Sequence, residues 1–101
     1  MYLRLKNLQI QKKYLTKVNS GVQGFLKIGF SGFGIEDEGK RITDRLREFK
    51  VGDKGIDFEA TTTDGREYVG TCEILSLKIE EPEPGENRGK FRFSGELKKE
   101  A

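Results

Sequence analysis

The sequence predicts a mainly β protein, an antiparallel β-sandwich or small barrel of about six strands with one short helix. Apolar and polar residues alternate with a period of two in several segments, and thirteen glycines interrupt the chain. A single segment shows helical spacing instead. With 101 residues there is room for one core, so we expect residues 1–101 to form a single domain.

The alternation is clearest at residues 55–62, where Ile56, Phe58 and Ala60 alternate with charged or hydroxyl side chains. This pattern is typical of a strand with one buried and one solvated face. Residues 63–65 end in a glycine and predict a hairpin turn back onto the next strand.

That next strand is expected at residues 67–80. Its apolar residues change phase between Ile74 and Leu75, which predicts a β-bulge or a change of sheet. Residues 81–89 contain both prolines and predict a long exposed loop. A last alternating strand should follow at residues 90–97, and we expect the tail after it to fray.

The first part of the chain predicts further strands. Residues 3–10 hold two short apolar alternations with a break near Asn7, and residues 26–30 alternate as well. Gly29, Gly32 and Gly34 interleave with apolar residues, a composition that suits a strand passing close to another backbone.

Helical spacing occurs where Ile42, Leu46 and Phe49 fall at positions i, i+4 and i+7. We expect Thr43 to cap this helix and Asp44 to lie in its first turn.

Charge is unevenly distributed along the chain. All seventeen acidic residues follow Ile35, whereas residues 1–35 carry six Lys and Arg residues. We therefore expect a surface with two electrostatic sides, suited to a polyanion or to the opposite pole of another copy.

The composition argues against an enzyme. The chain has no histidine, the most common general acid or base near neutral pH. Carboxylate pairs such as Asp57 with Glu59 fit the solvated face of a strand, and the acidic residues 36–38 fit a solvated turn. We expect neither a catalytic site nor a metal site from these residues, and no cofactor or small-molecule substrate.

The single Cys72 cannot form an internal disulfide, which suits a reducing compartment, and we expect it to be buried. No segment approaches the length of apolar sequence that a membrane span needs. We therefore expect no membrane association and no secretion by a standard signal.

Residues 42–97 resemble the carboxy-terminal half of phage tail tube, or major tail, proteins. The resemblance runs from ITDRLREF at 42–49 and GIDFEA at 55–60 through YVGTCEILSL at 68–77 to PGEN at 84–87 and FRFSGEL at 91–97. It includes a strand with a Gly-Thr step and a Leu-Ser-Leu ending, followed by a loop and a closing strand with a Ser-Gly pair. The first forty residues do not follow the pattern.

The resemblance implies a non-enzymatic structural subunit of a virion or of the bacterial cytoplasm that self-assembles into rings or tubes. In that family a β-sandwich with a flanking helix forms rings, usually hexameric, that stack through loops. The stacking contacts here would come from the loop 81–89 or from a turn at residues 19–23. The loop residues that we assign to assembly are Pro82, Pro84, Gly85 and Asn87.

The basic first segment leaves an alternative open, a small OB-like barrel that binds single-stranded nucleic acid. Cations that track phosphates and rings that stack on bases would both be present. The residues assigned to this reading are Tyr2, Arg4, Lys6, Lys12, Lys13 and Tyr14. Cations beside an aromatic residue are also typical of the outer face of an edge strand, where lysine discourages unwanted pairing.

Overall fold

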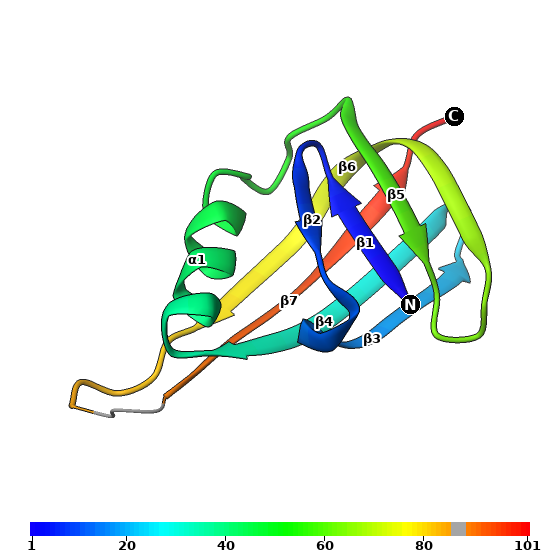
Figure 1. Ribbon diagram of the computed structural model, residues 1–101. Coiled ribbons are helices and arrows are strands. Elements are labelled where there is room, and N and C mark those ends of the chain that lie inside the picture. Colours follow the sequence, from blue (N-terminus) through cyan, green and yellow to red (C-terminus); the bar gives the residue numbers. More distant parts are fainter. Residues whose placement is uncertain (86–88) are drawn as a thin grey trace.

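The computed structural model describes residues 1–85 and 89–101 and contains one antiparallel sheet with one α-helix (Figure 1). The sheet order is β2-β1-β5-β6-β7-β4-β3. The elements in chain order are β1 Tyr2–Leu5, β2 Leu8–Ile10, the 3-10 turn η1 Lys12–Tyr14, β3 Leu15–Val22, β4 Leu26–Ile35, α1 Glu36–Leu46, β5 Ile56–Thr61, β6 Glu67–Glu80 and β7 Lys90–Lys99.

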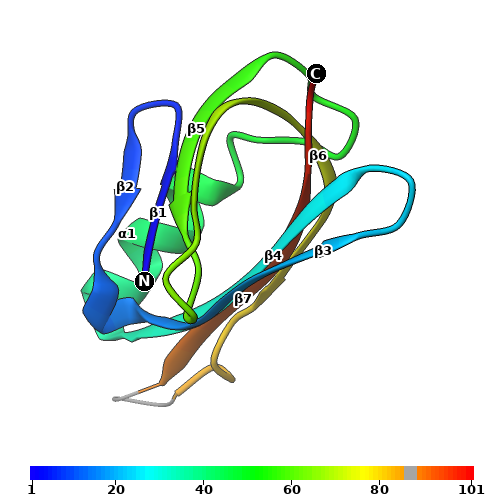
Figure 2. The same ribbon diagram turned by 90° about the vertical axis from the view of Figure 1, so that its right-hand side faces the viewer.

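The sheet curls strongly around its own inner face but does not close (Figure 2). Short strands β1, β2 and β5 lie opposite β4 and β7, β6 bends from the side of β5 to the side of β7, and α1 packs against β4 and β7. This arrangement confirms the predicted mainly β class with one helix. The molecule is elongated, with extents of 45 × 27 × 23 Å.

The core lies on the concave side of the sheet and is built from the alternate residues that the sequence pattern indicated. Phe58 and Ala60 of β5 are buried there, and the rings of Phe30 and Phe93 pack with their centroids 6.4 Å apart. Strands β1 and β2 and helix α1 contribute further fully buried side chains, as do the long strands: Leu3, Leu5, Leu8, Ile10, Ile42, Thr43, Leu46, Val18, Ile28, Ile74 and Leu97.

The predicted bulge in β6 is confirmed. The register with β7 shifts between Ile74 and Ser76, so Leu75 occupies an extra position. Cys72 and Ile74 are buried before the shift, and Leu77 packs against the core after it. One inserted residue reconciles the two apolar phases within a single strand.

Inner-face glycines let other parts of the chain approach β4 closely. A Cβ atom at Gly32 would overlap the Tyr14 carbonyl oxygen and lie 2.6 Å from Cζ of Phe93. At Gly34 it would lie 2.6 Å from the Cα of Gly39, where α1 crosses the strand. The predicted close backbone approach is therefore present at these positions.

The helix begins earlier than the sequence spacing predicted. It starts at Glu36, so the expected cap Thr43 lies inside it, and the Thr43 hydroxyl donates a hydrogen bond to the Gly39 carbonyl at 3.1 Å. The N-cap position is Ile35, which makes no side-chain cap. The acidic residues 36–38, expected in a turn, form the first helical turn, where carboxylates interact favourably with the helix dipole.

Two other boundary predictions were wrong. Residues 19–22 belong to β3, and the hairpin turn lies beyond Val22. The tail does not fray directly after the last predicted strand residue, because β7 continues to Lys99 and the Glu100 amide donates to the Thr71 carbonyl at 2.9 Å.

Replacing Gly32 by alanine tests whether the close approach is required. We expect Gly32→Ala to lower the free energy of unfolding by about 1–3 kcal/mol, because the overlap with the Tyr14 backbone cannot be relieved by a rotamer change. Gly21→Ala is the matched control, since a Cβ atom there meets nothing within 4 Å. Urea unfolding of both variants measures the difference, and equal stability would contradict the tight packing.

Candidate functional site

The sheet has two edge strands, which are its most evident sites for joining another chain. One edge is β2, with three residues, and the other is β3, with eight residues. β3 pairs with β4 along one side only. An edge strand presents its outward backbone groups as a template for another strand.

The outer side of β3 is occupied at one point by a turn. The Val18 amide donates to the Thr63 hydroxyl at 3.2 Å, and the Val18 carbonyl accepts from the Thr63 amide at 2.7 Å. The turn between β5 and β6 therefore holds β3 near the middle of its length, and the sheet is joined there across its opening.

After Val18, every second residue of β3 directs its backbone N–H and C=O groups away from β4 and toward the open side of the sheet. Backbone groups of an antiparallel strand point alternately to its two sides. The backbone N–H and C=O of Val18 point away from β4, toward Thr63. The Gln23 amide donates a hydrogen bond to the Phe25 carbonyl across the hairpin at 3.0 Å. The backbone groups of the odd-numbered residues therefore point toward β4. The amides of Ser20 and Val22 therefore point outward, and the Val22 side chain is 76% exposed.

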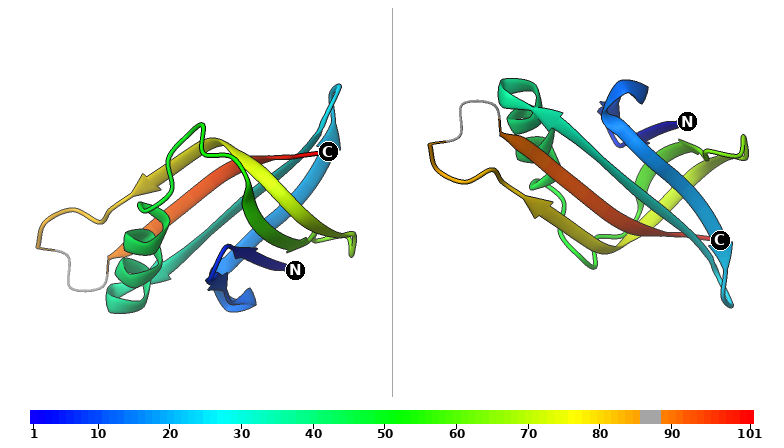
Figure 3. Two further views of the ribbon diagram at one scale, coloured as in Figure 1. Left: turned by 90° about the horizontal axis from the view of Figure 1, so that it is seen from above. Right: turned by 90° about the horizontal axis from the view of Figure 1, so that it is seen from below.

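The loop assigned to assembly projects from the opposite end of the long strands (Figure 3). Pro84 and Gly85 form a turn, and Gly85 has the positive φ of 93° that suits a glycine. Arg47 at the end of α1 holds the base of the loop through Glu81, with Nη2 and Oε1 2.6 Å apart. Pro82 is half-buried, and Asn87 lies outside the described residues.

The predicted nucleic-acid residues fall into two groups. Tyr2 and Arg4 lie on β1, and Lys6 lies in the turn that follows. The Arg4 guanidinium contacts the carboxylates of Asp57 at 2.9 Å and Glu59 at 3.1 Å. These hydrogen bonds raise the pKa of Arg4, and a phosphate would have to compete with both carboxylates for its guanidinium.

The second group is η1. Lys12 and Lys13 are exposed, but Tyr14 is buried, and its hydroxyl donates a hydrogen bond to the Glu38 carboxylate. The Lys13 ammonium lies 5.1 Å from the Tyr14 ring centroid. A buried ring cannot stack on a base, so this group offers exposed cations without an exposed ring.

The basic first segment is partly neutralised where its strands pair with acidic ones. Antiparallel pairing puts β1 beside β5, which brings Arg4 to Asp57 and Glu59. Pairing of β4 with β7 brings Lys27 to Glu96 at 2.9 Å and lowers the pKa of that carboxyl. The expectation of a two-sided surface was therefore wrong for these basic residues.

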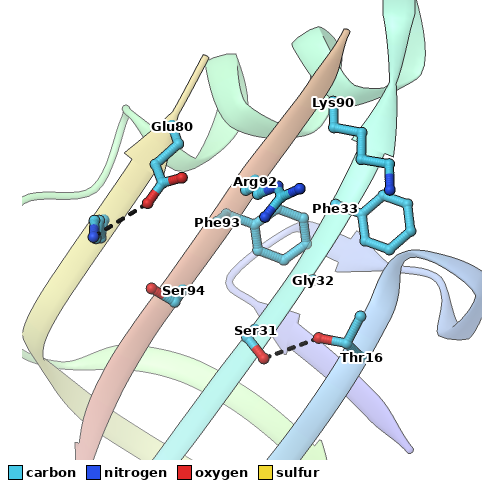
Figure 4. A pocket seen from close by; sticks show the side chains of 10 residues that line it. Thr16, Ser31, Gly32, Phe33, Glu80, Lys90, Arg92, Phe93 and Ser94 are labelled. Carbon is cyan, nitrogen blue, oxygen red and sulfur yellow. Dashed lines mark hydrogen bonds and ion pairs between the residues drawn. The ribbon is translucent and has the colours of Figure 1, made fainter. Parts of the chain in front are cut away.

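A shallow groove on the convex side of the sheet was not identified from the sequence (Figure 4). It crosses β6, β7 and β4, has a volume of about 440 Å³, and carries Lys78, Lys90 and Arg92 with one carboxylate, Glu80. Alternation indicated that Lys90 and Arg92 face solvent. It could not show that β4 lies beside β7, because these strands are distant in sequence.

Cys72 is fully buried in the core, as its surroundings in the sequence predicted. Burial, with smaller effects from the charges of Glu100 and Asp57, raises the pKa of its thiol to about 12. A protonated thiol is a poor nucleophile. Cys72 therefore contributes packing rather than reactivity.

Comparisons with known proteins found no matching family model, no matching curated protein and no matching solved structure. Among residues 1–85 and 89–101, no three or more Cys, Asp or Glu side chains gather where they could hold a metal ion. The described part of the chain also contains no helix long and apolar enough to cross a membrane.

The Cys72 thiol predicts a pH dependence of stability. The folded protein keeps this proton at pH values where the unfolded chain loses it, so the contribution is complete below about pH 9 and is lost as the pH rises toward about 12. We expect wild type to lose stability relative to Cys72→Ala by up to about 1.4 kcal/mol per pH unit in this window. Urea unfolding of both proteins between about pH 8 and pH 11 measures it. Parallel pH profiles would contradict the shift.

Proposed function

We propose that this protein is a non-enzymatic structural subunit that self-assembles through the edges of its sheet, in the manner of a phage tail tube protein. The observation that carries the proposal is the edge of β3 beyond Val18. There the backbone points outward, and the apolar Val22 side chain is exposed.

This edge is only partly protected against pairing. Natural edge strands are commonly blunted by charge, by proline, by shortness or by a covering loop. Lys17 and the contact with Thr63 protect the first half of β3. The second half contains Ser20, Gly21 and Val22, which offer neither charge nor proline. Because only the first half of β3 is protected, the proposal puts the pairing with another copy at residues 20–22.

The two projecting ends of the molecule support a repeating assembly. The β3–β4 hairpin extends at one end, and the loop that follows β6 extends at the other (Figure 3). Copies joined head to tail, with β3 of one copy on the other edge of the next, would present these ends on opposite faces of a ring, where they could contact the next ring. Such a subunit would belong to a virion or to the cytoplasm of an infected bacterium.

The alternative is single-stranded nucleic-acid binding through the basic first segment. The exposed Lys12 and Lys13 favour it, but Arg4 is engaged by two carboxylates and Tyr14 is buried. The structure thus gives this alternative less support than it gives assembly.

Substitution of Val22 by lysine tests assembly through β3. The side chain is 76% exposed, so the monomer should fold normally, while a lysine on the pairing edge discourages addition of another strand. We expect wild type to form oligomers as concentration rises, and Val22→Lys to associate about fivefold more weakly at each interface. Sedimentation velocity across a concentration series measures this.

Val51→Lys is the matched control, because Val51 is 64% exposed and lies in the segment after α1, outside the strands. It should associate like wild type. A wild-type protein that remains monomeric at every concentration, or equal weakening by both substitutions, would contradict the proposal.

A further inference from the structure

The convex side of the sheet carries an excess of positive charge. We define the outer face as the outward side chains of β3, β4 and β7 and of the part of β6 that pairs with β7. The pairing registers place six cations and three carboxylates there. The cations are Lys17, Lys27, Lys78, Lys90, Arg92 and Lys98, and the carboxylates are Glu73, Glu80 and Glu96.

Internal ion pairs use only part of this charge. Lys27 pairs with Glu96 at 2.9 Å, and Lys78 pairs with Glu80 at 3.1 Å. The Arg92 side chain is exposed, and its guanidinium forms no ion pair or hydrogen bond with a side chain among residues 1–85 and 89–101, although Glu80 lies across from it on β6. A free guanidinium at the centre of a groove is an available donor for an anion.

Aromatic rings lie on the same face as the cations. The Lys90 ammonium is 4.8 Å from the centroid of the Phe33 ring, and the Lys98 ammonium is 5.0 Å from that of Phe25. Both rings are only half-buried, unlike Tyr14. Figure 4 shows Phe33 of β4 beside the Lys90 side chain of β7, with Arg92 further along β7.

Neutral hydrogen-bonding groups complete the groove. The hydroxyls of Thr16 and Ser31 lie 3.0 Å apart, and Ser94 lies beside them on β7. Hydroxyl groups can donate hydrogen bonds to phosphate oxygens or to base edges, and they carry no negative charge that would repel a phosphate.

Lys90 and Arg92 are two residues apart on β7, so they lie about 7 Å apart along one face of the strand. Neighbouring phosphates of an extended single strand have a similar spacing. We propose that the outer face binds single-stranded nucleic acid, with Lys90 and Arg92 on consecutive phosphates and Phe33 stacked on a base. Half-buried rings among cations on a sheet surface favour this ligand over an acidic peptide, which would use the cations and leave the rings unused.

This binding would be a function beyond assembly, and it would use the outer face rather than the basic first segment. It is tested with a fluorescently labelled oligothymidylate of about 20 nucleotides, titrated at several salt concentrations and followed by anisotropy. Sedimentation of the same samples reports the oligomeric state, so loss of assembly and loss of binding are separate outcomes.

The double variant Lys90→Gln with Arg92→Gln should bind about tenfold more weakly at low salt, and its slope of log affinity against log salt should fall by about 1.4. Two control pairs remove the same charge elsewhere. Lys50→Gln with Lys54→Gln, in the segment after α1, and Lys12→Gln with Lys13→Gln, in η1, should both bind like wild type.

Phe33→Leu tests stacking separately from charge. It should weaken binding by about tenfold while leaving the salt slope unchanged, because the phosphate contacts remain. Polyglutamate of equal charge should not displace the oligonucleotide.

Four results would overturn the proposal. The first is absence of binding at low salt, and the second is an equal loss of affinity in either control pair, Lys50→Gln with Lys54→Gln or Lys12→Gln with Lys13→Gln. The third is full affinity in Phe33→Leu, and the fourth is displacement of the oligonucleotide by polyglutamate. Loss in the Lys12 and Lys13 pair alone would assign binding to η1, and displacement would assign the outer face to an acidic protein.

Discussion

The fold depends on how tightly the sheet can curl around a small core. Only 34% of the residues are hydrophobic, so the two sides of the sheet must approach closely to exclude water. Glycines on the inner face make the approach possible. A Cβ atom at Gly95 would lie 2.7 Å from Cζ of Phe30, and one at Gly34 would collide with the backbone of α1. The rings and the helix occupy the volume that side chains would otherwise fill.

The curl brings the two borders of the sheet near each other without closing them. β3 meets the β5–β6 turn through Val18 and Thr63, and no strand pairs with the remainder of its outer side among the described residues. Closure into a barrel would remove the edges. The contact with Thr63 fixes the position of β3, and in its second half the Ser20 hydroxyl bonds the Tyr68 hydroxyl at 3.0 Å while the outward backbone has no strand partner among the described residues. A fixed, open edge is suited to adding a strand from another copy. The same curvature puts the apolar side chains inside and gathers cations from separate strands on the convex face.

Much of the architecture could be predicted from alternation, because burial of one face imposes a period of two. β5, β6 and β7 were found in this way, and the phase change at Ile74 located the bulge. β3 was not recognised as a strand, since only Leu15 and Val18 face the core strongly and the rest of the strand is polar. The start of α1 was missed because the residues 36–38 are acidic, which suits both a solvated turn and a first helical turn.

The surfaces were less accessible to sequence reasoning than the core. Pairing of β4 with β7 joins residues about sixty positions apart, and it alone puts Phe33 beside Arg92. Pairing of β1 with β5 neutralises Arg4 in the same way. A one-dimensional charge pattern contains no information on which strands become neighbours. The basic first segment therefore indicated a polyanion site in one place, whereas the outer face gathers an excess of cations and two half-buried rings in another.

The central claim is that β3 is an open edge beyond Val18. Amide hydrogen exchange, measured residue by residue in dilute and concentrated protein, tests it most directly. The account predicts a protected amide at Val18 under both conditions, and amides at Ser20 and Val22 that exchange rapidly in dilute protein and slowly in concentrated protein. Slow exchange at Ser20 and Val22 in the dilute monomer, or rapid exchange at every concentration, would contradict it.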